Sequence, residues 1–272
     1  MSQLSLLGCG SSGGGGFAGI LDAYSSNLAG AYDINRRLLG SYNGPLIKLR
    51  KASGGESDFS PLASGWLDVA GITTWAGVSS LFLVTQYDQS GNGRHRTQAT
   101  AGSQPPVDLT SGPDNRVRYN TNGGFFSLGA GTMGAAHTGA TTLVQIQNVN
   151  GGLFYRSDSL ADAGGEDIIV LSRSPATSIY VQWDNTGNIS TAVTGISGWM
   201  VSTARVQSTA TKVRQLTNAG SSTDNPGSMT INWDRMKSGN GFYCSAFMAW
   251  TRGLSDAEMD ALHADFRTLY NL

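Results

Sequence analysis

The chain has 272 residues, a formal net charge of −1 and 14% charged residues, so it carries no basic field for a nucleic-acid backbone. No run of about 18 apolar residues occurs, which argues against a membrane-spanning helix. The 37 glycines are about twice the usual share and predict many turns between short strands. These features favour a single large β domain, which we place at residues 17–272.

The first sixteen residues predict a flexible arm, because their Gly/Ser-rich end cannot bury enough surface to become ordered by itself. An ordered arm would need a neighbouring molecule to hold it. We therefore consider an assembly arm, with Cys9, Gly13, Gly14, Gly15 and Gly16 as its contact residues, beside the alternative of a mobile tail. Cys9 and Cys244 are the only cysteines, which is no disulfide framework and offers no metal-ligand spacing.

Residues from Phe17 onward follow a helical period that predicts an N-terminal helix. Its apolar stripe consists of Leu21, Tyr24, Leu28 and Ala31. The segment 45–50 then alternates apolar and basic residues, as a half-buried strand does. Residues 66–75 predict a short helix that leads into a buried strand at 80–86.

A polar turn follows that strand and carries the clearest motif of the chain. It reads Tyr87-Asp88-Gln89-Ser90-Gly91-Asn92-Gly93, with an Asn-Gly step that is typical of a tight turn. The motif resembles the arabinofuranosidase B catalytic-domain family, and it also resembles laminin-G-like modules of bacteriophage structural proteins. These two resemblances imply different functions, one catalytic and one structural.

The same turn contains the first half of a calcium loop. Asp88, Ser90 and Asn92 place oxygen atoms at alternate positions before a glycine, which is the ligand spacing that calcium prefers. The twelfth position, where a bidentate glutamate would stand, is Ala99. The alternative is an Asx turn, in which the side chains of Asp88 and Asn92 satisfy backbone groups.

The segment from 105 to 250 is a succession of short apolar or alternating runs divided by turn residues, which predicts an antiparallel sandwich or barrel. The runs are 116–120, 124–129, 141–148, 152–156, 167–172, 178–183, 188–193, 199–206, 211–217, 227–233 and 241–251. A capping box from Ser255 to Glu258 then predicts a C-terminal helix. This ending resembles laminin-G-like jelly rolls. The predicted fold is a mainly β, concanavalin-like antiparallel β-sandwich (jelly roll) with an N-terminal helix and a capped C-terminal helix.

The arabinofuranosidase resemblance implies two catalytic carboxylates. Asp184, in the phrase Val181-Gln182-Trp183-Asp184-Asn185, matches the family's nucleophile position, and Asp234 matches its acid position. The nucleophile is one methylene shorter than the family's glutamate, and a displacement on the order of 1 Å costs about a hundredfold in rate. Trp183 and Trp233 each precede an aspartate, where they would stack on a sugar ring. The alternatives are a hairpin turn at Asp184 and tryptophans that are buried structure.

We prefer, from sequence, a non-enzymatic bacteriophage virion protein of the head, collar or tail. It would be made in the host cytoplasm and assemble with other virion proteins through its arm. We expect a homo-oligomer that binds protein or a host-surface glycan. No cofactor other than calcium is expected. The alternative is a retaining glycoside hydrolase of the arabinofuranosidase type. A soluble lectin-like module is a third hypothesis.

Overall fold

The computed structural model describes residues 17–120, 141–148, 155–157, 170–172, 178–183, 187–192, 198–206, 214–217, 220–222, 236–238 and 243–272. In the strands between 155 and 192 and between 214 and 238, the backbone alone is described. The helices are η1 (Asp22–Tyr24), α1 (Val69–Ala76), η2 (Ala101–Ser103), η3 (Pro113–Asn115) and α2 (Asp256–Leu269). The strands are β1 (Leu28–Asp33), β2 (Ile47–Lys51), β3 (Glu56–Phe59), β4 (Leu81–Gln86), β5 (Arg96–Thr97), β6 (Pro106–Asp108), β7 (Arg118–Asn120), β8 (Thr141–Asn148), β9 (Tyr155–Ser157), β10 (Val170–Ser172), β11 (Ser178–Trp183), β12 (Gly187–Ala192), β13 (Trp199–Val206), β14 (Arg214–Thr217), β15 (Gly220–Ser222), β16 (Met236–Ser238) and β17 (Tyr243–Trp250).

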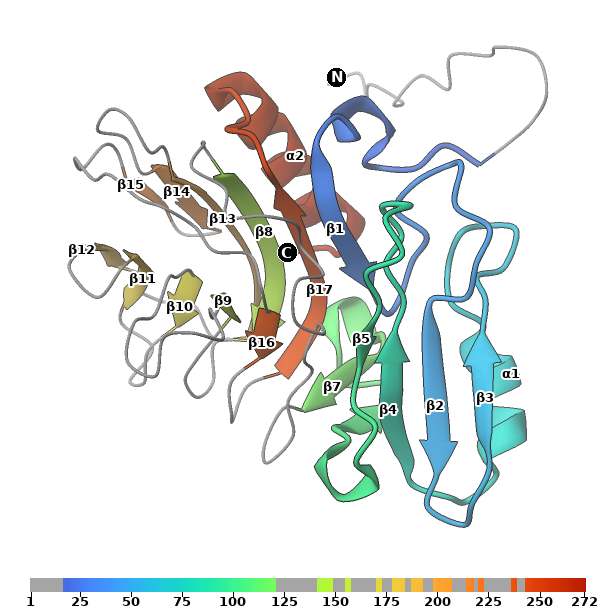
Figure 1. Cartoon of the computed structure of the whole chain (residues 1–272). Helices are drawn as coiled ribbons and strands as arrows, with labels where there is room; N and C mark the ends of the chain where they lie inside the picture. The colour runs from blue at the N-terminus through green and yellow to red at the C-terminus, as the bar shows by residue number, and fades with distance from the viewer. Residues whose placement is uncertain are drawn as a thin grey trace, which may run out of the picture.

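A large antiparallel sheet organises the molecule (Figure 1). Its strand order is β15-β14-β13-β8-β17-β7-β6-β4-β2-β3, with β1 also paired to β17 and β5 paired to β4. Strand β17 lies at its centre, because one edge of β17 pairs with β8 and the other pairs with both β1 and β7. Smaller sheets are formed by β10, β11 and β12 and by β9 and β16.

Two hydrophobic clusters cover the two faces of the central strands. Val144 and Ile146 of β8 pack in the same cluster as Leu262 and Phe266 of α2, so this face of β8 is directed toward the helix. Leu143 belongs to the other cluster, which reaches α1. Because side chains alternate along a strand, the odd-numbered residues of β8 lie on the face away from α2, which we call the inner face.

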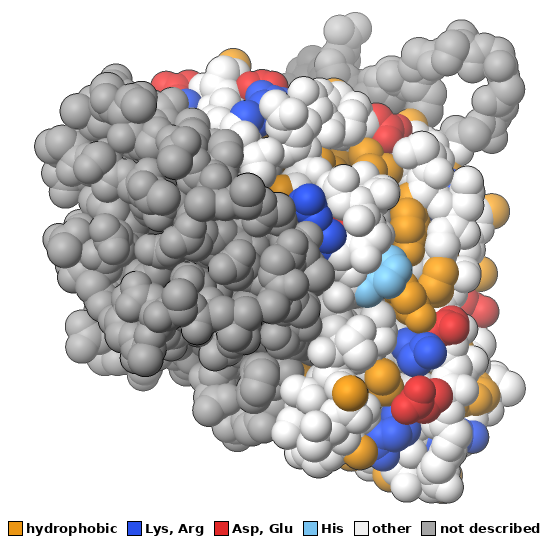
Figure 2. All heavy atoms as spheres, in the orientation of Figure 1, with side chains coloured by type: hydrophobic (Ala, Val, Ile, Leu, Met, Phe, Trp, Pro, Cys, Tyr) orange, Lys and Arg blue, Asp and Glu red, His pale blue; other side chains and the backbone are white. Residues whose placement is uncertain are grey.

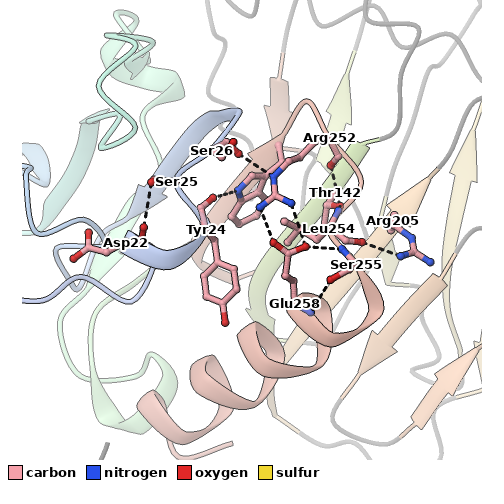
Figure 3. Close-up of polar contacts among 11 residues, drawn as sticks. Asp22, Tyr24, Ser25, Ser26, Thr142, Arg205, Arg252, Leu254, Ser255 and Glu258 are labelled. Carbon is pink, nitrogen blue, oxygen red and sulfur yellow. Dashed lines mark hydrogen bonds and ion pairs between the residues drawn. The ribbon is translucent and has the colours of Figure 1, made fainter. Parts of the chain in front are cut away.

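Polar contacts fix the beginning of helix α2 (Figure 3). The Ser255 hydroxyl accepts a hydrogen bond from the Glu258 amide, and the Glu258 carboxylate accepts one from the Ser255 amide at 2.7 Å. Arg252 donates to both Glu258 oxygens, at 3.1 and 2.9 Å, and to the Ser26 carbonyl at 3.0 Å. The helix start is thereby joined to the turn that precedes β1.

The structure confirms the predicted β-sandwich and the capped C-terminal helix. The runs predicted at 141–148, 178–183 and 199–206 are β8, β11 and β13 with the same bounds. The short helix predicted within 66–75 is α1. None of the helices in the part of the chain that the structure describes is long and apolar enough to cross a membrane.

The predicted helix after Phe17 is wrong. The chain forms one short 3-10 turn, η1, and then strand β1, all six residues of which are buried. The residues of β1 from Leu28 to Tyr32 are apolar, aromatic or glycine and show no alternation of apolar and polar residues, so the chance spacing of Leu21, Tyr24, Leu28 and Ala31 imitated a helix.

Candidate functional site

The polar loop 87–95, which connects β4 to β5, holds strand β1 in place. The Asp88 carboxylate is buried and accepts hydrogen bonds from the amides of Ala31, Ser90 and Arg94 at 3.0, 2.9 and 3.0 Å. The Ser90 hydroxyl donates a further bond at 2.8 Å. Each Asp88 oxygen therefore has two donors, and one of these donors lies 57 residues earlier in the chain.

Neighbouring side chains of the loop make further hydrogen bonds to β1 and to the residues that follow it. The Asn92 amide donates to the Leu28 carbonyl at 2.8 Å. The Gln89 carboxamide accepts from the Leu38 amide at 2.7 Å and donates to the carbonyls of Asp33 and Arg36. The motif that supports the family resemblance thus serves the fold.

Calcium binding at Asp88, Ser90 and Asn92 stays a prediction. A cation there would have to displace the backbone amides that already bind the Asp88 oxygens. Among the described residues, no group of three or more His, Cys, Asp and Glu side chains could hold a metal ion.

The inner face of the central sheet carries a row of buried polar side chains. Gln145 and Gln147 lie two residues apart on β8, and Ser202 of β13 is the register partner of Gln145. All three are buried, and the Gln145 carboxamide donates to that of Gln147 at 2.8 Å. Within the described part of the chain, the remaining Oε1 of Gln145, Nε2 of Gln147 and Oγ of Ser202 have no hydrogen-bond partner. We call these three residues the inner polar row.

Unpaired buried polar atoms are rare, because each costs about 1–3 kcal/mol when no partner replaces water. Three of them on adjacent positions are therefore an unusual feature of this face. The row offers both donors and acceptors, but its three side chains include no carboxylate. A catalytic acid or nucleophile would therefore have to come from elsewhere.

Aromatic and polar side chains continue the inner face beyond the row. Phe247 is the register partner of Gln145, and its ring stacks on Tyr32 at a centroid distance of 6.5 Å. The Arg96 guanidinium lies 5.4 Å from the Tyr32 centroid and donates to Gln86 at 2.8 Å. Among the described residues, the Nε2 atom of Gln86 has no partner. Aromatic rings of β17 and β1 therefore lie between the inner polar row and the polar side chains of β4 and β5.

A second buried polar group joins β1 to the end of α2. Tyr270 donates a short hydrogen bond to Asp33, whose other oxygen accepts from the Asn35 amide at 2.7 Å. Asn35 in turn bonds the Ser245 hydroxyl and Val117. Burial raises the pKa of Asp33 to about 6, against the opposing effect of the Tyr270 hydrogen bond. Asp33 is fully buried, and its hydrogen bonds join β1 to the residue that follows α2.

The sequence-predicted catalytic residues lie mostly outside the described part of the chain. Asp184, Trp233 and Asp234 are outside it, and so are the arm residues Cys9, Gly13, Gly14, Gly15 and Gly16. Trp183 ends strand β11 opposite Gly187 of β12, in the hairpin that the alternative interpretation expected next to Asp184. The carboxylate pair and the sugar-stacking tryptophans stay predictions.

The inner polar row was not among the residues predicted from the sequence, although a signal was present. Two glutamines stand at alternate positions of an otherwise apolar run, Leu143-Val144-Gln145-Ile146-Gln147. An alternation of that kind places both carboxamides on one face of a strand. What the sequence does not show is that this face is buried.

Comparison with curated proteins finds α-L-arabinofuranosidases of fungi. The chain is 36% identical over 89 residues to an α-L-arabinofuranosidase of Hypocrea jecorina. It is 30% identical over 168 residues to a probable α-L-arabinofuranosidase B of Aspergillus flavus, and 35% identical over 126 residues to the α-L-arabinofuranosidase B of Emericella nidulans. These matches cover 31%, 56% and 44% of the chain, and only 18%, 33% and 22% of the relatives. No family model matches.

Solved structures show the same fold. A GH54 α-L-arabinofuranosidase soaked with a cyclic sulfate inhibitor superposes with a TM-score of 0.71 at 15% identity, over 92% of this chain and 64% of the other. An arabinofuranosidase complexed with arabinofuranosyl-α-1,2-xylobiose gives 0.72 at 15% identity, over 93% and 65%. At this identity the likeness concerns the fold alone.

The expectation of a bacteriophage virion protein is wrong. Both the sequence relatives and the structures of the same fold are arabinofuranosidases, and the relatives come from fungi. The laminin-G-like phage resemblance and the virion location are corrected by the same findings. The preference for a non-enzymatic protein rested on the phage interpretation, because a jelly-roll ending is shared by binding proteins and hydrolases and does not distinguish them. The homo-oligomer and the domain bounds 17–272 stay predictions.

Proposed function

We propose that this chain is a glycoside hydrolase that acts on terminal α-L-arabinofuranosyl groups. The observation that carries the proposal is the sequence similarity to α-L-arabinofuranosidases, at 30% to 36% identity in the three relatives named above. The shared fold over more than nine-tenths of the chain supports it. The inner polar row adds buried, unpaired hydrogen-bonding groups of the kind that sugar hydroxyls satisfy.

In this proposal Asp184 is the nucleophile and Asp234 is the acid. A retaining mechanism needs the two carboxyl groups about 5 Å apart, so that one attacks the anomeric carbon while the other protonates the leaving oxygen. Asp234, which is a carboxylate after it has given its proton to the leaving group, then takes a proton from the water that attacks the anomeric carbon and releases the sugar from Asp184. The inner polar row would hold the sugar hydroxyls and fix the ring against the nucleophile.

Substrates with different leaving groups distinguish the role of Asp184 from that of Asp234. With 4-nitrophenyl α-L-arabinofuranoside, which needs little protonation, we expect Asp184→Asn to lower kcat by more than about a thousandfold and Asp234→Asn to lower it much less. With an arabino-oligosaccharide, Asp234→Asn should lose about 100- to 10,000-fold. Asp260→Asn serves as the control, because Asp260 is exposed on α2, which covers the face of the sheet away from the inner polar row.

Each result bears on a different part of the proposal. A wild-type chain without activity on either substrate would overturn the function. An active wild type whose Asp184→Asn and Asp234→Asn variants keep full activity would leave the function standing and refute the residue assignment.

A further inference from the structure

A line of arginine side chains stacked on aromatic rings runs past the end of helix α2, on the face of β7 opposite the inner face. We propose that it binds an acidic saccharide, one that carries carboxylate groups. We call it the basic–aromatic track, and it consists of Arg36, Arg37, Trp66, Arg116, Arg118 and Tyr243. The choice of a saccharide rests on the proposed function, whereas the need for an anion follows from the track itself.

Two guanidinium groups share the Trp66 ring. The Cζ atom of Arg36 lies 4.8 Å from the ring centroid and that of Arg116 lies 3.4 Å from it. The Trp66 ring also meets Tyr270 edge to face at 6.0 Å, which locates the pair beside the end of α2. Burial lowers the pKa of Arg36, Tyr270 and Asp33 oppose this effect, and the charge of Arg116 lowers the pKa further. Two like charges are thus held close together by an aromatic residue.

The stacking continues on both sides of this pair. Arg36 and Arg37 both lie over Phe17, at 5.3 and 4.0 Å from its centroid. On the other side, Arg118 lies 3.7 Å from the Tyr243 centroid. Each arginine of the track therefore lies over at least one aromatic ring.

The alternation of side chains along residues 116–119 shows on which face of the sheet the track lies. Val117 and Tyr119 are buried in the inner-face cluster, so Arg116 and Arg118 lie on the opposite face of the same segment. The track is therefore a different surface from the inner polar row.

The arginines of the track have few partners of opposite charge. Within the described residues, the buried Nε atoms of Arg36, Arg37 and Arg116 have no hydrogen-bond partner. Arg116 lies 3.7 Å from Asp114, and Arg118 lies 3.4 Å from Asp108, whose side chains are 36% and 39% exposed. Such exposed pairs contribute little. Among the described residues, the four arginines outnumber Asp108, Asp114 and Asp33, whose charge acts on Arg36, which leaves a local charge of +1 in a chain whose net charge is −1.

A cavity lies at the Tyr243 end of the track. Its volume is about 180 Å³, and it is lined by Pro106, Val107, Asp108, Arg118, Asn120 and Tyr243. This hollow is open to solvent, so the track ends beside a place where a ligand group can lie.

The chemistry of the track fits a polymer with widely spaced carboxylates. A guanidinium fork binds a planar carboxylate through two parallel hydrogen bonds, and arginine on an aromatic ring is already oriented for it. A nucleic acid, with one negative charge per about 1.7 Å of duplex, needs a broader basic field. On the face shown in Figure 2, Lys and Arg side chains of the described residues are interspersed with Asp and Glu.

The test is isothermal titration calorimetry of the whole chain with a glucuronic-acid-substituted xylo-oligosaccharide and with its carboxyl-reduced counterpart. We expect binding of the acidic compound, and affinity at least about tenfold lower in Arg36→Gln/Arg116→Gln, because charge-assisted bidentate contacts are lost. The matched control is Arg50→Gln. Arg50 also stacks on a ring, 4.6 Å from the Phe82 centroid, but its guanidinium is already bonded to Gln104 and Ala101.

Equal affinity for the acidic and the reduced compound, or equal affinity of the double variant and the wild type, would overturn the proposal. So would tighter binding of a single-stranded oligonucleotide. Near-ultraviolet circular dichroism shows whether the double variant folds. If it does not, Arg36→Lys/Arg116→Lys is used instead, which keeps both charges and should bind the acidic compound severalfold more weakly than wild type. Unchanged affinity of this lysine variant refutes the proposal. Hydrolysis of 4-nitrophenyl α-L-arabinofuranoside should be unchanged in these variants, so binding without hydrolysis would refute only the proposed function.

Discussion

The two ends of helix α2 are each fixed by a carboxylate, and the two carboxylates behave in opposite ways. At the first turn, Glu258 is partly exposed and receives two bonds from Arg252 and one from the Ser255 amide. These hydrogen bonds lower its pKa to about 2. At the last turn, Asp33 is fully buried, and burial raises its pKa to about 6 even though Tyr270 donates to it.

The difference shows that surroundings decide which protonation state of a carboxyl group stabilises a fold. Glu258 stabilises the structure when it is charged, because the Arg252 guanidinium and the Ser255 amide donate hydrogen bonds to it. Asp33 is bonded by a phenol and an amide away from water, and it stabilises the structure best when it is protonated. The contacts at the two ends of the helix therefore stabilise it most at mildly acidic pH, where Glu258 is charged and Asp33 is largely protonated.

Replacement of Tyr270 by phenylalanine should have the largest effect. It removes a buried hydrogen bond and leaves an Asp33 oxygen without its donor, which costs about 1–3 kcal/mol. Because the Tyr270 hydrogen bond lowers the pKa of Asp33, its loss should also move the titration of Asp33 to higher pH. Urea unfolding at several pH values measures both. A variant as stable as wild type, with the same pH dependence, would contradict the role given to this contact.

Replacement of Asp33 by asparagine should change the pH dependence more than the stability itself. The folded pKa of about 6 exceeds the ordinary value of 3.8, so the folded state binds the proton more tightly. The contribution of the protonated group is complete below about 3.8 and is lost as pH rises through about 6. Asp33→Asn should flatten this decline in the free energy of unfolding. A decline that persists in the variant would have to come from another group.

Replacement of Glu258 by glutamine should have the smallest effect and the opposite sign with pH. The folded pKa of about 2 lies below the usual 4.5, so the contribution is present above about 4.5 and is lost as pH falls through about 2. At neutral pH we expect a loss of about 1 kcal/mol, because one exposed capping contact and ion pair is weakened. Thermal unfolding should show that the difference in stability between wild type and Glu258→Gln is smaller at pH below about 3 than at neutral pH. Glu56→Gln, the same substitution at an exposed position of β3, is the matched control.

The elements that the sequence predicted well are those with local signals. The capping box at Ser255 marks the start of α2, and the run 141–148 is bounded as β8 because its residues alternate. Strand β1 was missed because its residues from Leu28 to Tyr32 are apolar, aromatic or glycine, so its sequence has no period of two.

The candidate site was harder to predict because its contacts join distant segments. The spacing of Asp88, Ser90 and Asn92 suggested a metal, but their actual partners lie in β1 and within the loop itself. The Trp66 ring meets two arginines that are 30 and 50 positions away from it in sequence, which no local pattern reveals. Pairings of this kind follow from sheet topology rather than from neighbouring residues.

The pairing of β1 with β17 has a consequence for how the protein is made. Leu28 is opposite Trp250, so the first strand waits on the ribosome until more than 200 further residues have been synthesised. During that time a strand that is buried on both faces in the finished sheet stays without its partner, and such late, long-range pairing slows folding and invites aggregation. Chaperone dependence during translation is the expected outcome.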